Sequence, residues 1–195
     1  MKGKFPSLPS PPDISDVFLK FPQGVRPLLE LHDALLRGDS PLTPGEREMI
    51  AAHVSGLNAC DYCYGAHSSI ASAFGIDKRL FEAMQNDLEG ARIPDELKPI
   101  LYYVSKLTIS PSKLTARDAQ QVYEAGWSER ALYDAISVCA LFNFMNRLVE
   151  GTGCSPAAEA AGEDEHEPLM SYLAWGEEMG FALGCTTLAR NPMFL

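Results

Sequence analysis

Apolar side chains recur at intervals of three and four residues along most of this chain, which is the spacing of amphipathic helices. The clearest run follows Pro94 and places five apolar residues on one helical face, namely Leu97, Ile100, Leu101, Val104 and Leu107. No segment shows the two-residue alternation between hairpin turns that indicates a sheet. The pattern therefore predicts an all-α fold, a helical bundle in a single domain.

Prolines, glycines and capping residues divide this pattern into separate helices. Ser128 would cap the longest one, whose broad apolar surface predicts burial on more than one side, in the core or between subunits. The first predicted helix should bury Leu28, Leu31, Leu35 and Leu36. The predicted helices span residues 25–37, 44–56, 60–74, 77–86, 94–110, 115–126, 128–151 and 168–180.

The same punctuation divides the chain into three parts. Residues 25–153 form the expected helical domain, and residues 154–195 are interpreted as a linker, a C-terminal helix and a tail. Five prolines within residues 1–24 argue against a regular helix there. This first segment is nevertheless too apolar to remain a solvated tail. We expect an extended arm that lies over the body of the protein or over a partner subunit.

Composition and charge narrow the class of protein. The 195 residues are 46% hydrophobic and 22% charged, which is typical of a soluble globular protein. A formal net charge of −10 leaves no basic surplus to neutralise phosphates, so we expect no nucleic-acid partner. No apolar run has the length of a membrane span, and the first residues lack the order of a secretion signal. Five cysteines, an odd number, fit reduced thiols and a cytoplasmic location better than a disulfide-stapled secreted fold.

The most informative stretch is EREMIAAHVSGLNACDYCYGAH, residues 46–67. Thr43 followed by Pro44 and Glu46 predicts a helix start with a capping box. The break at residues 56–58 ends that helix, and a second helix should begin at about Cys60, with Asn58 as a possible cap. Positions 60, 63 and 67 of this second helix share one face, so two thiols and an imidazole point the same way.

That face has the composition of a redox site. A thiol in the first turn of a helix, within Cys-x-x-Cys and near an imidazole, has a lowered pKa and is the reactive nucleophile. Asp61 opposes this effect, because a neighbouring carboxylate disfavours a second negative charge. If the two helices pack antiparallel, Glu48 returns to the thiols and can orient His67. We therefore predict a Cys60/Cys63 redox dithiol with an acid–base relay of Glu48 and His67.

The spacing Glu-x11-Cys-x2-Cys-x3-His resembles that of the AhpD-like alkylhydroperoxidases of the carboxymuconolactone decarboxylase superfamily. The resemblance implies that Cys63 attacks a hydroperoxide and that Cys60 donates a proton and then forms a disulfide with Cys63. It also implies a relay of Glu48 and His67, a homo-oligomer, and a lipoyl-type or thioredoxin-type dithiol reductant. No cofactor or metal is expected. Tyr62 stands where the family prototype has histidine, which resembles the broader peroxidase-related branch.

A second segment extends the resemblance to residues 25–153. Asn143, Asn146 and Arg147 interrupt an otherwise apolar helix and resemble the FN-x-x-NR pattern of peroxidase-related members. Buried polar side chains must be hydrogen-bonded, so we expect these three to form a network that ties helices or subunits together. Cys139 in the same helix is expected to be a small buried hydrophobe, and Cys154 to be inert.

Two other functions fit the same residues. Cys60, Cys63 and His67 could bind zinc together with Glu48 or His53 in a non-catalytic oligomeric protein. Alternatively, the dithiol could act on disulfides instead of peroxides.

Overall fold

The structure is a computed structural model that describes residues 4–155 and 167–182. Within these two stretches every regular element is helical, as the sequence predicts. The helices are α1 (Ile14–Lys20), α2 (Val25–Leu36), α3 (Pro44–Leu57), α4 (Asp61–Ala73), α5 (Arg79–Asn86), α6 (Lys98–Ile109), the 3-10 turn η1 (Pro111–Lys113), α7 (Ala116–Glu124), α8 (Glu129–Thr152) and α9 (Tyr172–Glu178).

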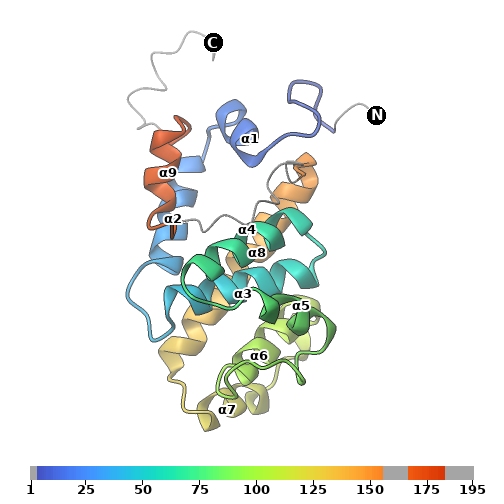
Figure 1. Ribbon diagram of the computed structural model, residues 1–195, viewed down its shortest axis with the longest axis vertical. Coiled ribbons are helices and arrows are strands. Elements are labelled where there is room, and N and C mark those ends of the chain that lie inside the picture. Colours follow the sequence, from blue (N-terminus) through green and yellow to red (C-terminus); the bar gives the residue numbers. More distant parts are fainter. Residues whose placement is uncertain (1–3, 156–166, 183–195) are drawn as a thin grey trace.

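Helices α3 and α4 form an antiparallel pair at the centre of the molecule (Figure 1). Helix α8 packs against both and extends along the long axis of the molecule. Helices α5, α6 and α7 gather at one end, and α2 pairs with α9 toward the other. Every residue of α3 from Arg47 to Ser55 is buried, because neighbouring helices surround this helix. None of the described helices is long and apolar enough to cross a membrane.

The turn between α3 and α4 positions the cysteines. Helix α3 starts at Thr43 with the predicted capping box to Glu46. The chain then reverses through Ala59, which has a φ of 54°, and the Cys60 N–H donates to the Ser55 carbonyl at 3.0 Å. The prediction that Asn58 caps the second helix is wrong, since Cys60 occupies the N-cap position. The Asn58 side chain instead reaches across to α8.

The expectation of an extended N-terminal arm is wrong for residues 14–20. The clustered prolines end at Pro12, and Asp13 then caps α1 through a capping box with Asp16. No proline follows until Pro22, so nothing prevents this short helix. Phe18 of α1 is 3% exposed, which places the helix over the body of the protein.

Helices α2 and α9 also differ from expectation. Helix α2 buries Leu29 and His32, whereas Leu31 is 45% exposed, so its inner face is rotated from the predicted one. Helix α9 is shorter than predicted, and Ser171 is its N-cap residue. The Ser171 hydroxyl and the Tyr172 N–H both donate to the carboxylate of Asp33 in α2. Residues 156–166 of the predicted linker and 183–195 of the predicted tail lie outside the described residues.

Candidate functional site

The two thiols of the Cys-x-x-Cys motif are buried and adjacent. Cys60 is the N-cap residue of α4 and Cys63 lies in its first turn, with the sulfur atoms 2.8 Å apart. Their thiol–thiol hydrogen bond lowers the pKa of Cys60, and the same contact raises the pKa of Cys63. The pair therefore loses its first proton readily, because the remaining proton stabilises a single negative charge, and loses its second with difficulty.

Glu48 and His67 lie together, as their positions on the two helices predict. Nδ1 of His67 is 2.6 Å from Oε2 of Glu48, whose side chain is completely buried. Burial alone would raise the pKa of Glu48, but attraction to His67 and Arg37, with hydrogen bonds from His67 and Tyr172, holds it below the ordinary value. Glu48 is therefore a carboxylate at neutral pH and can only accept hydrogen bonds.

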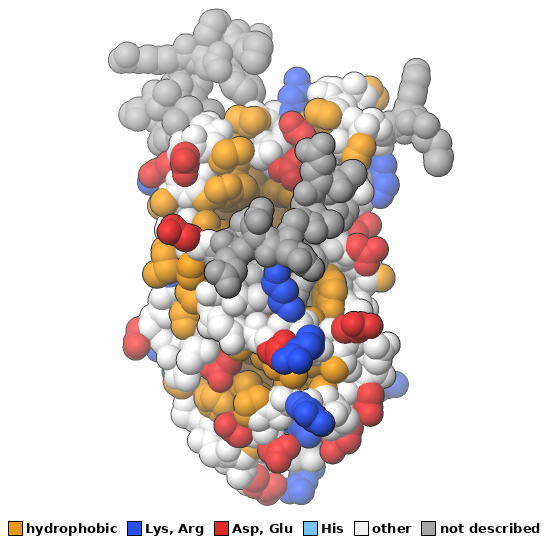
Figure 2. Space-filling view, viewed as in Figure 1, with side chains coloured by type: hydrophobic (Ala, Val, Ile, Leu, Met, Phe, Trp, Pro, Cys, Tyr) orange, Lys and Arg blue, Asp and Glu red, His pale blue; other side chains and the backbone are white. Residues whose placement is uncertain are grey.

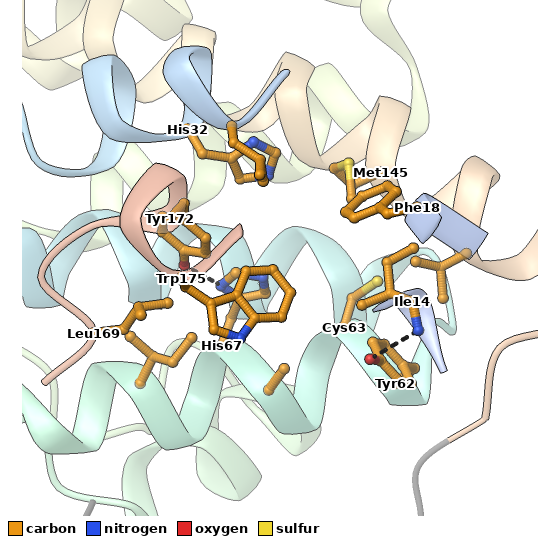
Figure 3. Close-up of a pocket in the computed structure, with 14 residues that line it drawn as sticks. Ile14, Phe18, His32, Tyr62, Cys63, His67, Met145, Leu169, Tyr172 and Trp175 are labelled. Carbon is orange, nitrogen blue, oxygen red and sulfur yellow. Dashed lines mark hydrogen bonds between the residues drawn. The ribbon is translucent and has the colours of Figure 1, made fainter. Parts of the chain in front are cut away.

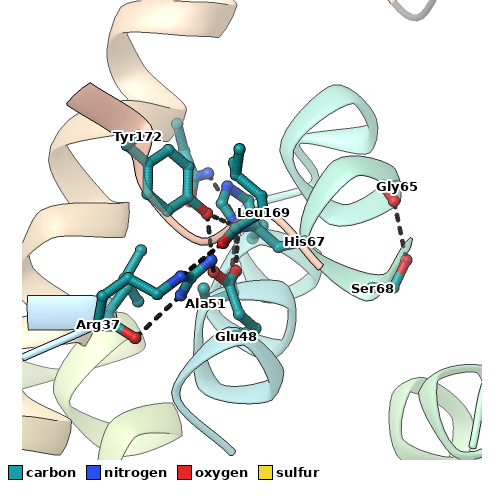
Figure 4. A network of polar contacts seen from close by, with 11 residues as sticks. Arg37, Glu48, Ala51, Gly65, His67, Ser68, Leu169 and Tyr172 are labelled. Carbon is teal, nitrogen blue, oxygen red and sulfur yellow. Dashed lines mark hydrogen bonds and ion pairs between the residues drawn. The ribbon is translucent and has the colours of Figure 1, made fainter. Parts of the chain in front are cut away.

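Two residues that the motif does not include complete this network (Figure 4). Arg37, just after α2, donates to Oε1 of Glu48 at 2.6 Å, and the Tyr172 hydroxyl donates to the same oxygen at 2.8 Å. The arginine also lies over the Tyr172 ring, with 5.0 Å between its central carbon and the ring centroid. Burial and then the charge of Glu48 raise the pKa of Tyr172 well above its usual value. The tyrosine thus remains a hydrogen-bond donor.

The contact with Glu48 determines which ring nitrogen of His67 carries the hydrogen. A carboxylate oxygen has no proton to give, so Nδ1 of His67 carries the hydrogen in the contact with Glu48. The second ring nitrogen, Nε2, is then left with a lone pair when the imidazole is neutral. The His67 ring packs edge-on against Phe142, at a centroid distance of 4.3 Å, which holds its orientation. Such an imidazole is suited to accept a proton from a thiol.

A cavity of about 230 Å³ lies beside these groups, enclosed by residues from α1, α2, α4, α8 and α9 and by Leu169 (Figure 3). Cys63 and His67 line it, whereas Cys60 does not. Most of the wall is apolar, contributed by Ile14, Phe18, Leu29, Ala66, Ile70, Met145, Val149, Leu169 and Trp175. On the outside, hydrophobic side chains surround a hollow between α9 and α1 (Figure 2). An apolar molecule bound here would meet the sulfur of Cys63 before that of Cys60.

Tyr62 attaches α1 to the wall of this cavity. Its hydroxyl donates to Oδ2 of Asp13 at 2.6 Å and accepts the backbone N–H of Ile14 at 3.4 Å. Burial and the contact with Asp13 raise the pKa of Tyr62, so the phenol stays protonated. The residue that replaces the prototype's histidine therefore holds the N-terminal helix in place.

The polar residues of α8 form the expected network, here between helices of one chain. Asn146 donates to Ser55 at 2.9 Å and accepts from Asn58 at 2.9 Å. Asn143 accepts from Asn58 at 3.2 Å and from Arg147 at 3.0 Å. The network ties α8 to the turn that carries Cys60, so it fixes the position of the dithiol.

The remaining predicted ligands and thiols lie apart from the site. Nε2 of His53 is 2.7 Å from the Ser105 hydroxyl. Within residues 4–155 and 167–182, no three His, Cys, Asp or Glu side chains are arranged to hold a metal ion. Cys139 and Cys154 are buried, and burial raises the pKa of both, which makes them poor nucleophiles.

Comparison with known structures identifies two proteins of the same fold. A peroxidase-related protein of Silicibacter sp. TM1040 is 26% identical, with a TM-score of 0.71 over 76% of this chain and 78% of that one. A peroxidase-related protein of Ralstonia eutropha JMP134 with an alkylhydroperoxidase AhpD core is 23% identical, and its TM-score is 0.70 over 82% of this chain and 95% of that one. The second likeness concerns the fold alone.

Sequence comparisons give two matches. One curated relative, a cysteine–tRNA ligase of Thioalkalivibrio sulfidiphilus, is 24% identical over 156 residues, which are 80% of this chain and 29% of the ligase. The chain thus spans under a third of that relative's length. Residues 22–86, which include Glu48, both motif cysteines and His67, match the carboxymuconolactone decarboxylase family. This match and the likeness to the 26%-identical peroxidase-related structure agree with the resemblance that the Glu-x11-Cys-x2-Cys-x3-His spacing indicates.

Proposed function

We propose that this protein is a thiol-dependent hydroperoxidase in which Cys63 attacks the peroxide and Cys60 resolves the product. The observation that carries the proposal is the placement of the two sulfurs. Cys63 lines an apolar cavity together with His67, and Cys60 lies 2.8 Å behind it, away from the cavity. A peroxide in the cavity therefore reaches one thiol, and the second is in position to form a disulfide with it.

The first step consumes the peroxide. Because the contact with Cys60 raises the pKa of Cys63, Cys63 needs a base as it attacks. His67 accepts the Cys63 proton through Nε2, Glu48 balances the positive charge of the imidazolium, and Cys60 keeps its proton. The sulfur of Cys63 attacks the terminal oxygen of ROOH, so an S–O bond forms and the O–O bond breaks. The alkoxide that leaves takes the proton from His67 and becomes the alcohol. Cys63 is now a sulfenic acid.

The second step forms the disulfide. Cys60 attacks the sulfur of the sulfenic acid, an S–S bond forms, and the S–O bond breaks. The hydroxide that leaves combines with the thiol proton of Cys60 to give water. A dithiol reductant, lipoyl-type or thioredoxin-type, then supplies two electrons and two protons to regenerate both thiols. The balance is one ROOH and one dithiol converted to one ROH, one water and one disulfide.

The surroundings of Cys63 support a small peroxide as the oxidising substrate. Cys63 is 4% exposed and lines a mostly apolar cavity, which has room for a small apolar molecule beside the sulfur. The wall of the cavity matches the apolar body of an organic hydroperoxide.

A turnover assay tests the proposal. The reduced protein is mixed with cumene hydroperoxide in the presence of dihydrolipoamide or of a thioredoxin system, and loss of peroxide is followed. We expect catalytic consumption that Cys63→Ser abolishes and that Cys139→Ser, a control at a buried thiol outside the cavity, leaves unchanged. Absence of peroxide consumption with every reductant, in a protein whose thiols are reduced, would contradict the proposal.

A further inference from the structure

One polar group in the cavity wall takes no part in the reaction described above. His32 of α2 is 3% exposed and lines the cavity, on the wall across from His67 of α4 (Figure 3). Its ring packs against Tyr172, at a centroid distance of 5.1 Å, and edge-on against Phe142, at 6.1 Å. These contacts hold the imidazole in one orientation.

The two nitrogens of His32 have different roles. Nδ1 lies 2.8 Å from the carbonyl oxygen of Leu28, and because a carbonyl only accepts, Nδ1 carries the hydrogen. Nε2 has no hydrogen-bond partner among the described residues. Burial lowers the pKa of His32 to about 4, so the ring is neutral at physiological pH. Nε2 is therefore free to accept a hydrogen bond from a molecule bound in the cavity that His32 lines.

The wall around this acceptor excludes charged ligands. Among the described residues that line the cavity there is no Lys, Arg, Asp or Glu. A carboxylate brought into such surroundings would lose its hydration without gaining a partner of opposite charge. A neutral ligand with an apolar body and one O–H group would satisfy both the wall and the acceptor.

We propose that Nε2 of His32 accepts a hydrogen bond from the hydroxyl end of a neutral organic ligand, and that this contact selects hydroperoxides and alcohols over ethers and over anions. The role of His32 during the reaction rests on the proposed function. The terminal O–H of the hydroperoxide donates to His32, so the oxygen that Cys63 must attack is held inside the cavity. Binding of the alcohol product needs no reaction and can be measured alone.

A comparison of two unreactive ligands isolates the hydrogen bond. 2-Phenyl-2-propanol carries the O–H group, and its methyl ether has nearly the same shape without the donor. Binding of each to the reduced protein is measured by titration calorimetry or by ligand-observed NMR. One neutral hydrogen bond should favour the alcohol by about 2- to 12-fold in the wild type. In His32→Phe the two ligands should bind equally.

A matched variant controls for the loss of a buried histidine. His53 is 6% exposed, and its pKa is likewise lowered to about 4 by burial, but it contacts Ser105 instead of the cavity. His53→Phe should therefore keep the preference for the alcohol. His32→Gln, which retains an acceptor, should restore part of the preference that His32→Phe loses.

Three results would overturn the inference: the wild type binds neither ligand, His32→Phe keeps the preference, or the preference is lost in His67→Gln instead. In turnover, His32→Phe should raise KM for cumene hydroperoxide by about 2- to 12-fold with a smaller change in kcat. If the alcohol preference depends on His32 but no peroxide is consumed, the proposed function fails while the binding role of His32 stands.

Discussion

Tyr172→Phe tests whether the C-terminal helix belongs to the site. The substitution removes the hydroxyl that donates to Glu48 at 2.8 Å and keeps the ring that packs on Arg37 and His32. A hydrogen bond to a charged group contributes about 1.5–3 kcal/mol. Arg37 still donates to the same carboxylate oxygen after the change, which places the loss in the lower half of that range. We expect the free energy of unfolding to fall by about 1.5–2 kcal/mol at neutral pH.

The effect should depend on pH in a defined direction. Burial tends to raise the pKa of Glu48, but His67, Arg37 and Tyr172 together keep it below the reference value of 4.5. A carboxyl whose pKa is lower in the folded than in the unfolded state stabilises the fold above the unfolded pKa. This contribution disappears as the pH falls through the folded value. The difference between wild type and Tyr172→Phe should thus be complete at neutral pH and shrink below pH 4.5.

Urea unfolding at neutral and acid pH measures both expectations, and initial rates of peroxide consumption measure the effect on His67. Tyr102→Phe is the matched control, because it also removes a hydroxyl bonded to a carboxylate, that of Glu89, but Tyr102 is 43% exposed. It should cost less than about 0.5 kcal/mol and leave the rate unchanged. Equal losses in the two variants, or a Tyr172→Phe loss that does not change with pH, would refute the reasoning.

Three further predictions concern the thiols, the α8 network and assembly. In a pH titration followed by thiolate absorbance, the first ionisation of the dithiol should have its midpoint below the ordinary cysteine pKa of about 8.5, and His67→Ala should raise this midpoint. A midpoint at or above that value in both proteins would contradict the role of His67 as a base. Asn146→Ala should lower the free energy of unfolding by about 1–3 kcal/mol, because it removes the hydrogen bonds that Asn146 makes with Ser55 and Asn58. A loss within experimental error in urea unfolding would contradict this role. Light scattering should give a mass that is a multiple of the 21.3 kDa chain, since Phe144 and Tyr133 of α8 are 53% and 66% exposed, and a monomer at micromolar concentration would contradict the expected homo-oligomer.

Local signals in the sequence were sufficient for the starts of three helices and for the contact between Glu48 and His67. The capping residues Thr43, Thr115 and Ser128 lie where α3, α7 and α8 begin, because a cap acts within one turn. The contact of Glu48 with His67 follows from helical spacing and a short connection that forces the two helices to pack antiparallel.

The remainder of the site depends on contacts between distant segments. Tyr172 and Glu48 are 124 residues apart, and no pattern near either residue relates them. The inner face of α2 is set by α9 and α8, which bury His32 and leave Leu31 exposed. The prolines of residues 1–24 argued against a helix in this segment, but all of them lie outside the seven residues of α1. For Tyr172 and for α2, tertiary packing decided what local spacing left open.

The central claim is that Cys63 is the thiol that attacks the peroxide, and the site of sulfenic acid formation tests it most directly. Reduced wild type, Cys60→Ser and Cys63→Ser are each treated with one equivalent of cumene hydroperoxide in the presence of dimedone, and the products are located by mass spectrometry. The wild type should lose the mass of two hydrogen atoms by forming a Cys60–Cys63 disulfide, and Cys60→Ser should carry dimedone on Cys63. Dimedone on Cys60 of the Cys63→Ser protein would reverse the assignment. Unoxidised thiols in all three proteins, with zinc bound to the wild type, would contradict the account as a whole.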